Sequence, residues 1–250
     1  MITLEICCGS AMDAIAAERG GAERIELNSA LSLGGLTPDI GSLLFCREKV
    51  KIPIIAMVRP RAGGFCYKTE EYEAMKRSAK VMLEAGADGL AFGFLKEDRT
   101  IDKERTVQMV QLVHSYGKEA VFHRAFDASV ALDTAIEQLI FAGVDRVLTS
   151  GGCETAAEGA MCLSHLQECY GNEIEILAGS GVRSSNVLSL LDETGVKQVH
   201  SSCRAFAADG TARGNGVSFA YTKASEWYAY EVVSEEQVRA IKRELTQWKG

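Results

Sequence analysis

Ionisable side chains lie within or directly after several short apolar segments of this sequence. Glu26 lies within the segment 24–27, His123 follows the segment 120–122, and Asp127 comes shortly after His123. A histidine beside a carboxylate can titrate near neutral pH and act as a general acid or base. We therefore hypothesise that Glu26, His123 and Asp127 are catalytic residues.

A second group of residues has the chemistry to hold an anion. Arginine side chains bind carboxylate or phosphate through paired hydrogen bonds, and glycines before a helix let backbone N–H groups approach a phosphate. One such glycine turn precedes a predicted helix that begins near Ser184 or Ser185. The same glycines would also serve a tight turn that binds nothing. The predicted substrate-binding residues are Arg59, Arg61, Ser150, Gly151, Gly179, Ser180, Gly181, His200 and Ser201.

Cysteines give a third kind of candidate site. Cys7 and Cys8 end the first predicted strand, and soft thiolates suit Cu(I), so Cys7 is the candidate metal ligand. The alternative is that the cysteines are small buried apolar residues, because the spacing of all eight matches no metal-binding module. Without a secretory signal, eight cysteines indicate reduced thiols in the cytoplasm.

A short sequence unit recurs along the chain and predicts the elements that position these residues. In each copy a helical pattern ends at a glycine, a small apolar residue follows, and a short strand begins. Four copies span 21–27, 86–92, 143–149 and 195–201, and four more strands are predicted at 3–7, 52–58, 118–123 and 173–178. Amphipathic helical patterns alternate with the strands, which predicts a single (β/α)8 TIM barrel. An open, doubly wound sheet is the alternative.

The strand period of two predicts which side chains face the barrel interior. Leu4 and Ile6 should face the helices, which leaves Glu5 and Cys7 inward. By the same rule Glu26, Asn28 and His123 face inward near the strand ends, where barrel enzymes carry their active sites. Such buried charges are costly unless paired, so a structural layer of salt bridges is the competing interpretation.

We expect one barrel domain over residues 1–250, with an irregular segment at 207–234 before the last helix. That segment carries Trp227, Tyr228 and Tyr230, which either pack against the barrel or form a subunit contact. Subunit contact would make the protein a homo-oligomer, and a dimer is the expected form. A noncatalytic assembly role is one functional alternative.

Composition narrows the classes of partner. The net charge of −7 would repel nucleic acid and anionic lipid over most of the surface. No run of residues approaches a membrane span, and the N-terminus lacks the basic region of a signal peptide. We therefore expect a cytoplasmic protein with neither a nucleic-acid nor a membrane partner.

Several motifs, in order along nearly the whole chain, resemble the CutC family of copper homeostasis proteins. They include Leu4-Glu5-Ile6-Cys7, Arg24-Ile25-Glu26-Leu27, Met57-Val58-Arg59-Pro60-Arg61, His123-Arg124-Ala125-Phe126-Asp127, Leu148-Thr149-Ser150-Gly151 and Ala178-Gly179-Ser180-Gly181. The resemblance implies a cytoplasmic TIM barrel that binds copper and is commonly oligomeric. It also implies two thiol ligands, one at Cys7 and one at the position that Asn28 holds here.

Two functions therefore compete at the level of sequence. The resemblance implies copper homeostasis, with Cu(I) bound by Cys7 together with another thiol, His123 or His200. The arrangement of Glu26, Arg59 and His123 favours an enzyme acting on a small anionic or phosphorylated metabolite, by isomerisation, aldol-type cleavage or hydrolysis.

Overall fold

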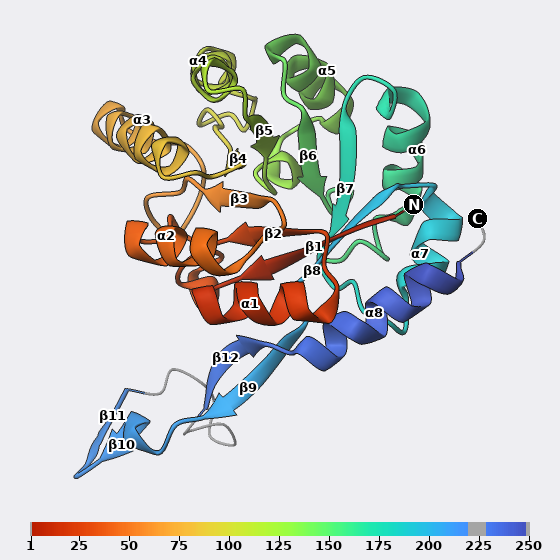
Figure 1. Cartoon of the computed structure of the whole chain (residues 1–250). Coiled ribbons are helices and arrows are strands. Elements are labelled where there is room, and N and C mark those ends of the chain that lie inside the picture. Colours follow the sequence, from red (N-terminus) through yellow and green to blue (C-terminus); the bar gives the residue numbers. More distant parts are fainter. Residues whose placement is uncertain (1, 220–228, 249–250) are drawn as a thin grey trace.

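Eight parallel strands close into a barrel, because each strand pairs with the next and β8 pairs with β1 (Figure 1). The computed structural model describes residues 2–219 and 229–248. The barrel strands are β1 (Thr3–Cys8), β2 (Arg24–Leu27), β3 (Ile54–Met57), β4 (Gly89–Phe92), β5 (Glu119–Phe122), β6 (Arg146–Thr149), β7 (Glu175–Gly179) and β8 (Gln198–Ser201). The closing β8–β1 pair confirms the predicted (β/α)8 barrel and excludes the open sheet.

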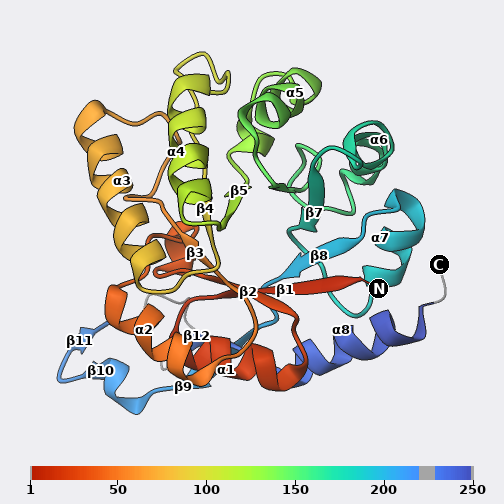
Figure 2. The ribbon, with the colours of Figure 1, turned by 45° about the horizontal axis from the view of Figure 1, so that its top comes forward.

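Helices surround the strands on the outside (Figure 2). They are α1 (Ala11–Gly20), α2 (Ile40–Lys49), α3 (Thr69–Glu84), α4 (Lys103–Ser115), α5 (Leu132–Ala142), α6 (Ala160–Tyr170), α7 (Val187–Thr194) and α8 (Glu235–Gln247). The repeat glycines end helices as expected: Gly21 follows α1 with a φ of 97°, and Gly143 follows α5 with a φ of 80°. This left-handed conformation is open to glycine at little cost, and it turns the chain toward the next strand.

The main core lies between the strands and the helices. Leu4, Ile6, Ile54 and Ala56 belong to it and are fully buried. Residues that alternate with these face the barrel interior, where a small separate cluster of Ile55, Met57, Ala91 and Val121 forms. The period of two therefore sends Glu5 and Cys7 inward as well, as the sequence predicts.

The chain leaves the barrel after β8 and forms a projecting arm. β9 (Arg204–Ala208) pairs antiparallel with β12 (Ala229–Val233), and β10 (Arg213–Gly214) pairs with β11 (Val217–Ser218) (Figure 1). The expectation of an irregular segment at 207–234 is therefore wrong for its described part, because strand pairing across the arm is not visible in the local pattern. Trp227 and Tyr228 lie outside the described residues, whereas Tyr230 lies on β12 and is half-exposed.

The last helix returns to the barrel. α8 packs against α1 and α7 and so fills the place of the eighth helix (Figures 1 and 2). Its N-cap Ser234 accepts a hydrogen bond from the backbone of Gln237, a typical start signal. Among the described helices, none combines the length and the apolar character that a bilayer crossing requires.

Candidate metal centre

Three potential ligands come together at one side of the barrel mouth. Cys7 and Glu26 are partners in the β1–β2 register, and His200 is the last residue but one of β8, which pairs with the other side of β1. One ligand atom from each, the thiol sulfur, a carboxylate oxygen and an imidazole nitrogen, lie within 4.8 Å of one another. These three donor types are the usual protein ligands of borderline and soft transition-metal ions.

Asn28 holds Cys7 and Glu26 together. Its Nδ2 donates to Glu26 Oε2 at 2.9 Å and lies 3.5 Å from Cys7 Sγ, which in turn lies 3.8 Å from Glu26 Oε2. Burial, together with the negative charge of Glu26, raises the pKa of the Cys7 thiol well above its usual value of 9.0. Burial also raises the pKa of Glu26. A bound cation would favour the deprotonated forms of both groups.

Glu5 fixes the orientation of His200. His200 Nδ1 lies 2.8 Å from Glu5 Oε1, and Arg24 forms an ion pair with the other carboxylate oxygen of Glu5. Burial alone would raise the pKa of Glu5, but the Arg24 charge and the His200 hydrogen bond outweigh it and lower the pKa to about 2. Burial opposes a charged His200, yet its hydrogen bond to Glu5 and the nearby Glu26 raise its pKa. Metal-binding histidines commonly have their second nitrogen held by a carboxylate in this way.

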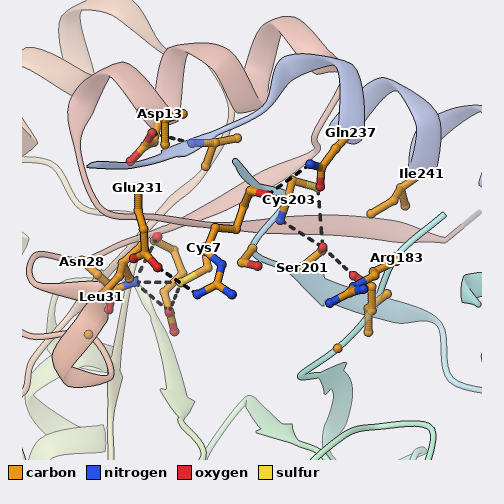
Figure 3. A pocket seen from close by; sticks show the side chains of 18 of the residues that line it. Cys7, Asp13, Asn28, Leu31, Arg183, Ser201, Cys203, Glu231, Gln237 and Ile241 are labelled. Atoms are coloured by element: carbon orange, nitrogen blue, oxygen red, sulfur yellow. Dashed lines mark hydrogen bonds and ion pairs between the residues drawn. The ribbon is translucent and has the colours of Figure 1, made fainter. Parts of the chain in front are cut away.

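The centre borders a cavity of about 740 Å³. In Figure 3, Cys7 and Asn28 lie at one end of the lining and Arg183 at the other. The loop after β7 supplies Gly181 and Arg183, the end of β8 supplies Ser201, and the arm supplies Phe206 and Glu231. A volume of this size is typical of small-molecule sites in proteins.

His123 and Arg59 form a different polar cluster. His123 Nδ1 accepts a hydrogen bond from the Ala125 backbone at 3.1 Å, and the ring packs at a tilt of 52° against Phe65, with centroids 5.0 Å apart. Burial and the Arg59 charge lower the pKa of His123 to about 3. Arg59 Nη1 donates to the carbonyls of Leu33 and Gly35, so this guanidinium holds the loop after β2. Within the described part of the chain, no hydrogen bond or ion pair joins this cluster to Glu26.

Asp127 lies at the centre of a hydrogen-bonded network formed by the segments that follow β5 and β6. Its carboxylate accepts from Thr149 Oγ1 at 2.5 Å, from the Ser150 and Gly152 backbones at 3.1 Å, and pairs with Arg124 at 2.8 Å. Gly151 belongs to the same network, since its backbone N–H donates to Thr149 Oγ1. Asp127 and Ser150 therefore have structural partners that already saturate them.

Some of the remaining predicted anion-binding residues are held by other parts of the protein, and others border the cavity. Arg61 forms an ion pair with Glu71 on α3 and lies over the Tyr67 ring. Ser180 Oγ donates to the Glu154 carbonyl at 2.6 Å, and Ser201 Oγ donates to the Val182 carbonyl at 2.8 Å. Gly179 packs against His200, whereas Gly181 and Ser201 line the cavity.

Glu5, Asn28 and Arg183 were not among the functional residues predicted from the sequence. Glu5 and Asn28 were expected to face inward, but the contact of Glu5 with His200 depends on the β1–β8 register. Arg183 follows the glycine turn after β7, and that position was the only available signal for it.

A family model described as the CutC family matches residues 2–205 of the chain. The chain belongs to the CutC family. A CutC family protein from Treponema denticola is 46% identical over 199 residues, which cover 80% of each chain. The human copper homeostasis protein cutC homolog is 37% identical over 239 residues, 95% of this chain and 87% of the human protein.

A solved CutC structure supports the same assignment. The CutC protein of Streptococcus agalactiae superposes with a TM-score of 0.75 at 32% identity, covering 81% of this chain and 99% of that one. Membership of the CutC family and the barrel fold inferred from the motifs are thus both confirmed.

Proposed function

We propose that this CutC-family protein binds one transition-metal ion through Cys7, Glu26 and His200, in line with the copper homeostasis role for which its human relative is named. The observation that carries the proposal is the convergence of three different ligand atoms within 4.8 Å. His200 is already oriented by Glu5, so little reorganisation is needed for binding. The adjoining cavity gives an ion a path to the centre.

Copper fits part of this donor set. Cys7 and His200 supply the soft thiolate and the imidazole that suit Cu(I). A second thiolate is lacking among the described neighbours, because the Cys8 side chain belongs to the core between strands and helices. Cys203 is also buried in that core. The centre therefore offers one sulfur ligand.

Metal titration tests the proposal. Cu(I), under anaerobic conditions, and Zn²⁺ are titrated separately into the protein against a competing chelator. We expect one tightly bound ion per chain for at least one metal, with affinity lost in Cys7→Ser and His200→Ala. Cys169→Ser is the control, because Cys169 is an exposed thiol on α6. Equal binding by the wild type and Cys7→Ser would refute the proposal.

The cavity favours a second candidate function, an enzyme that acts on a small anionic metabolite. Arg183 lies at the opposite side of the cavity from Cys7, and Ser184 and Ser185 also line the cavity. Together they can bind a phosphate or carboxylate. A thermal-shift screen with phosphorylated and carboxylated metabolites tests this function. Stabilisation of the wild type but not of Arg183→Ala is the expected result, and identical responses would count against it.

A further inference from the structure

Arg59 is a buried cation that has no ion-pair partner among the described residues. It is only 6% exposed, and its Nε is buried without a hydrogen-bond partner. Its Nη1 donates to the carbonyls of Leu33 and Gly35, and its Nη2 donates to that of Gly63. These three acceptors are neutral. Buried charges are normally paired with an opposite charge, so the unbalanced guanidinium requires an explanation.

Two more buried donors near Arg59 have no partner in the part of the chain that the structure describes. They are His123 Nε2 and the Tyr67 hydroxyl, and both residues are 4% exposed. Burial and the Arg59 charge lower the pKa of His123 to about 3, and the Ala125 backbone donates to Nδ1, so the ring is neutral with its proton on Nε2. Burial raises the pKa of Tyr67, although the Arg59 charge opposes the rise, so the hydroxyl keeps its proton. Buried donors nearly always have an acceptor, and here three lack one.

Phe65 covers this group of donors. Its ring centroid lies 5.0 Å from that of His123 and 5.2 Å from Arg59 Cζ. The ring is half-buried, and residues 62–64 before it are exposed, so it belongs to a surface loop. Arg59 also donates to Gly35, which lines the cavity of about 740 Å³. The donors therefore lie behind the wall of that cavity, and a ligand reaches them when the Phe65 ring turns aside.

We propose that Arg59, His123 and Tyr67 bind the carboxylate group of a small ligand. The two oxygens of a carboxylate accept up to about four hydrogen bonds, enough for all three donors. Its single negative charge balances the guanidinium, because His123 is neutral and the nearby Arg61 already pairs with Glu71. A phosphate carries nearly two negative charges, so part of its charge would stay buried and unbalanced. The group therefore favours a carboxylate over a phosphate.

Tyr67→Phe tests this site with the smallest change of shape. Acetate, pyruvate and inorganic phosphate are titrated into the protein, and the histidine ring signals are followed by ¹H–¹⁵N NMR, with His123→Gln to assign the His123 signal. We expect the two carboxylates to shift the His123 signal more strongly than phosphate does. Tyr67→Phe should weaken carboxylate binding by about 10-fold, the usual effect of losing one hydrogen bond to a charged group. The Tm of the free protein should not fall, because the lost hydroxyl had no partner.

Tyr72→Phe is the matched control. Tyr72 is also 4% exposed, but its hydroxyl donates to the Arg105 carbonyl and lies 3.1 Å from Gln108 Oε1. Its substitution should lower the Tm of the free protein, because two buried acceptors lose their donor, and should leave carboxylate binding unchanged.

Several outcomes would overturn the inference. The first is equal carboxylate binding by the wild type and Tyr67→Phe, or no shift of the His123 signal. A lower Tm of free Tyr67→Phe would show that the hydroxyl is bonded without a ligand, for example to a fixed water. Loss of binding in Arg183→Ala but not in Tyr67→Phe would place the carboxylate at the other end of the cavity. The metal proposal is independent of these results, since Cys7→Ser tests it.

Discussion

His200 Nδ1 lies 2.8 Å from Glu5 Oε1, although 195 positions separate the two residues in the chain. They become neighbours because β8 pairs with β1 and closes the barrel, with Glu5 opposite His200 in the register. Arg24 forms an ion pair with the same Glu5 carboxylate. One buried acid thus links barrel closure, a buried ion pair and the orientation of a proposed metal ligand.

Replacing Glu5 should affect both stability and metal affinity. Glu5→Gln leaves the buried Arg24 guanidinium without its counter-charge, so we expect a loss of about 3 kcal/mol in unfolding free energy. Metal affinity should fall by about 10- to 100-fold, because the amide no longer polarises His200. Urea unfolding and metal titration measure the two effects.

Glu175→Gln is the matched control for the Glu5 variant. Glu175 also pairs with a buried arginine, Arg146, but its side chain is 53% exposed and Glu119 pairs with the same arginine. Its substitution should cost less than about 1 kcal/mol and leave metal affinity unchanged. Equal effects of the two substitutions would contradict the role assigned to Glu5.

His123 should make stability depend on pH. Its pKa is lowered by burial and Arg59 from 6.5 to about 3, so between these values the unfolded chain binds a proton that the folded chain does not. The free energy of unfolding should therefore fall as the pH drops through this window, by about 1.4 kcal/mol per pH unit from this group. His123→Gln should show a correspondingly shallower dependence in urea unfolding across that range. Parallel curves for the two proteins would show that His123 is not buried in its neutral form.

Asp127 should prove structural. Asp127→Asn removes the negative charge of the carboxylate that accepts hydrogen bonds from Thr149, Ser150 and Gly152. We therefore expect the free energy of unfolding to fall by about 2 kcal/mol. Metal affinity should not change. Asp133→Asn serves as the control, since Asp133 is 62% exposed and its pairing with His165 should contribute little. A loss of metal binding in Asp127→Asn would instead place Asp127 in the functional site.

Gly93 makes room for His123. A Cβ on Gly93 would lie 2.5 Å from the Cε1 atom of the His123 ring and 2.6 Å from Ala125 Cβ. Gly93→Ala should therefore lower the unfolding free energy by about 1 to 3 kcal/mol, as overpacking does. Gly64→Ala is the control, because a Cβ there would meet nothing within 4 Å. Thermal unfolding compares them, and equal stability would show that His123 can move aside at little cost.

The barrel was predictable because its signals are local. Glycines that end helices and short apolar strands repeat along the chain, and each unit can be recognised without knowledge of the others. The period of two also predicted correctly that Glu5 and Cys7 alternate with the buried Leu4 and Ile6.

The candidate site was less predictable because its contacts join distant residues. Glu26 was paired with His123 at the level of sequence, but its contacts are with Cys7 and Asn28. Which inward residues meet depends on the stagger of the strands around the closed barrel, and no local pattern encodes that stagger. Arg59 was predicted to bind an anion, but its guanidinium donates to backbone carbonyls of the loop after β2. The sequence gives no sign of these contacts, because they depend on the path that the loop takes in the folded protein.

X-ray absorption spectroscopy of the zinc-loaded protein tests the central claim most directly. Zn–S distances of about 2.3 Å are distinguishable from Zn–N and Zn–O distances of about 2.0 to 2.1 Å. The structure predicts one sulfur neighbour per ion, from Cys7, with nitrogen and oxygen completing the shell. In Cys7→Ser the sulfur contribution should disappear. Two or more sulfur neighbours, or a sulfur contribution that persists in Cys7→Ser, would place the ion elsewhere and contradict the account.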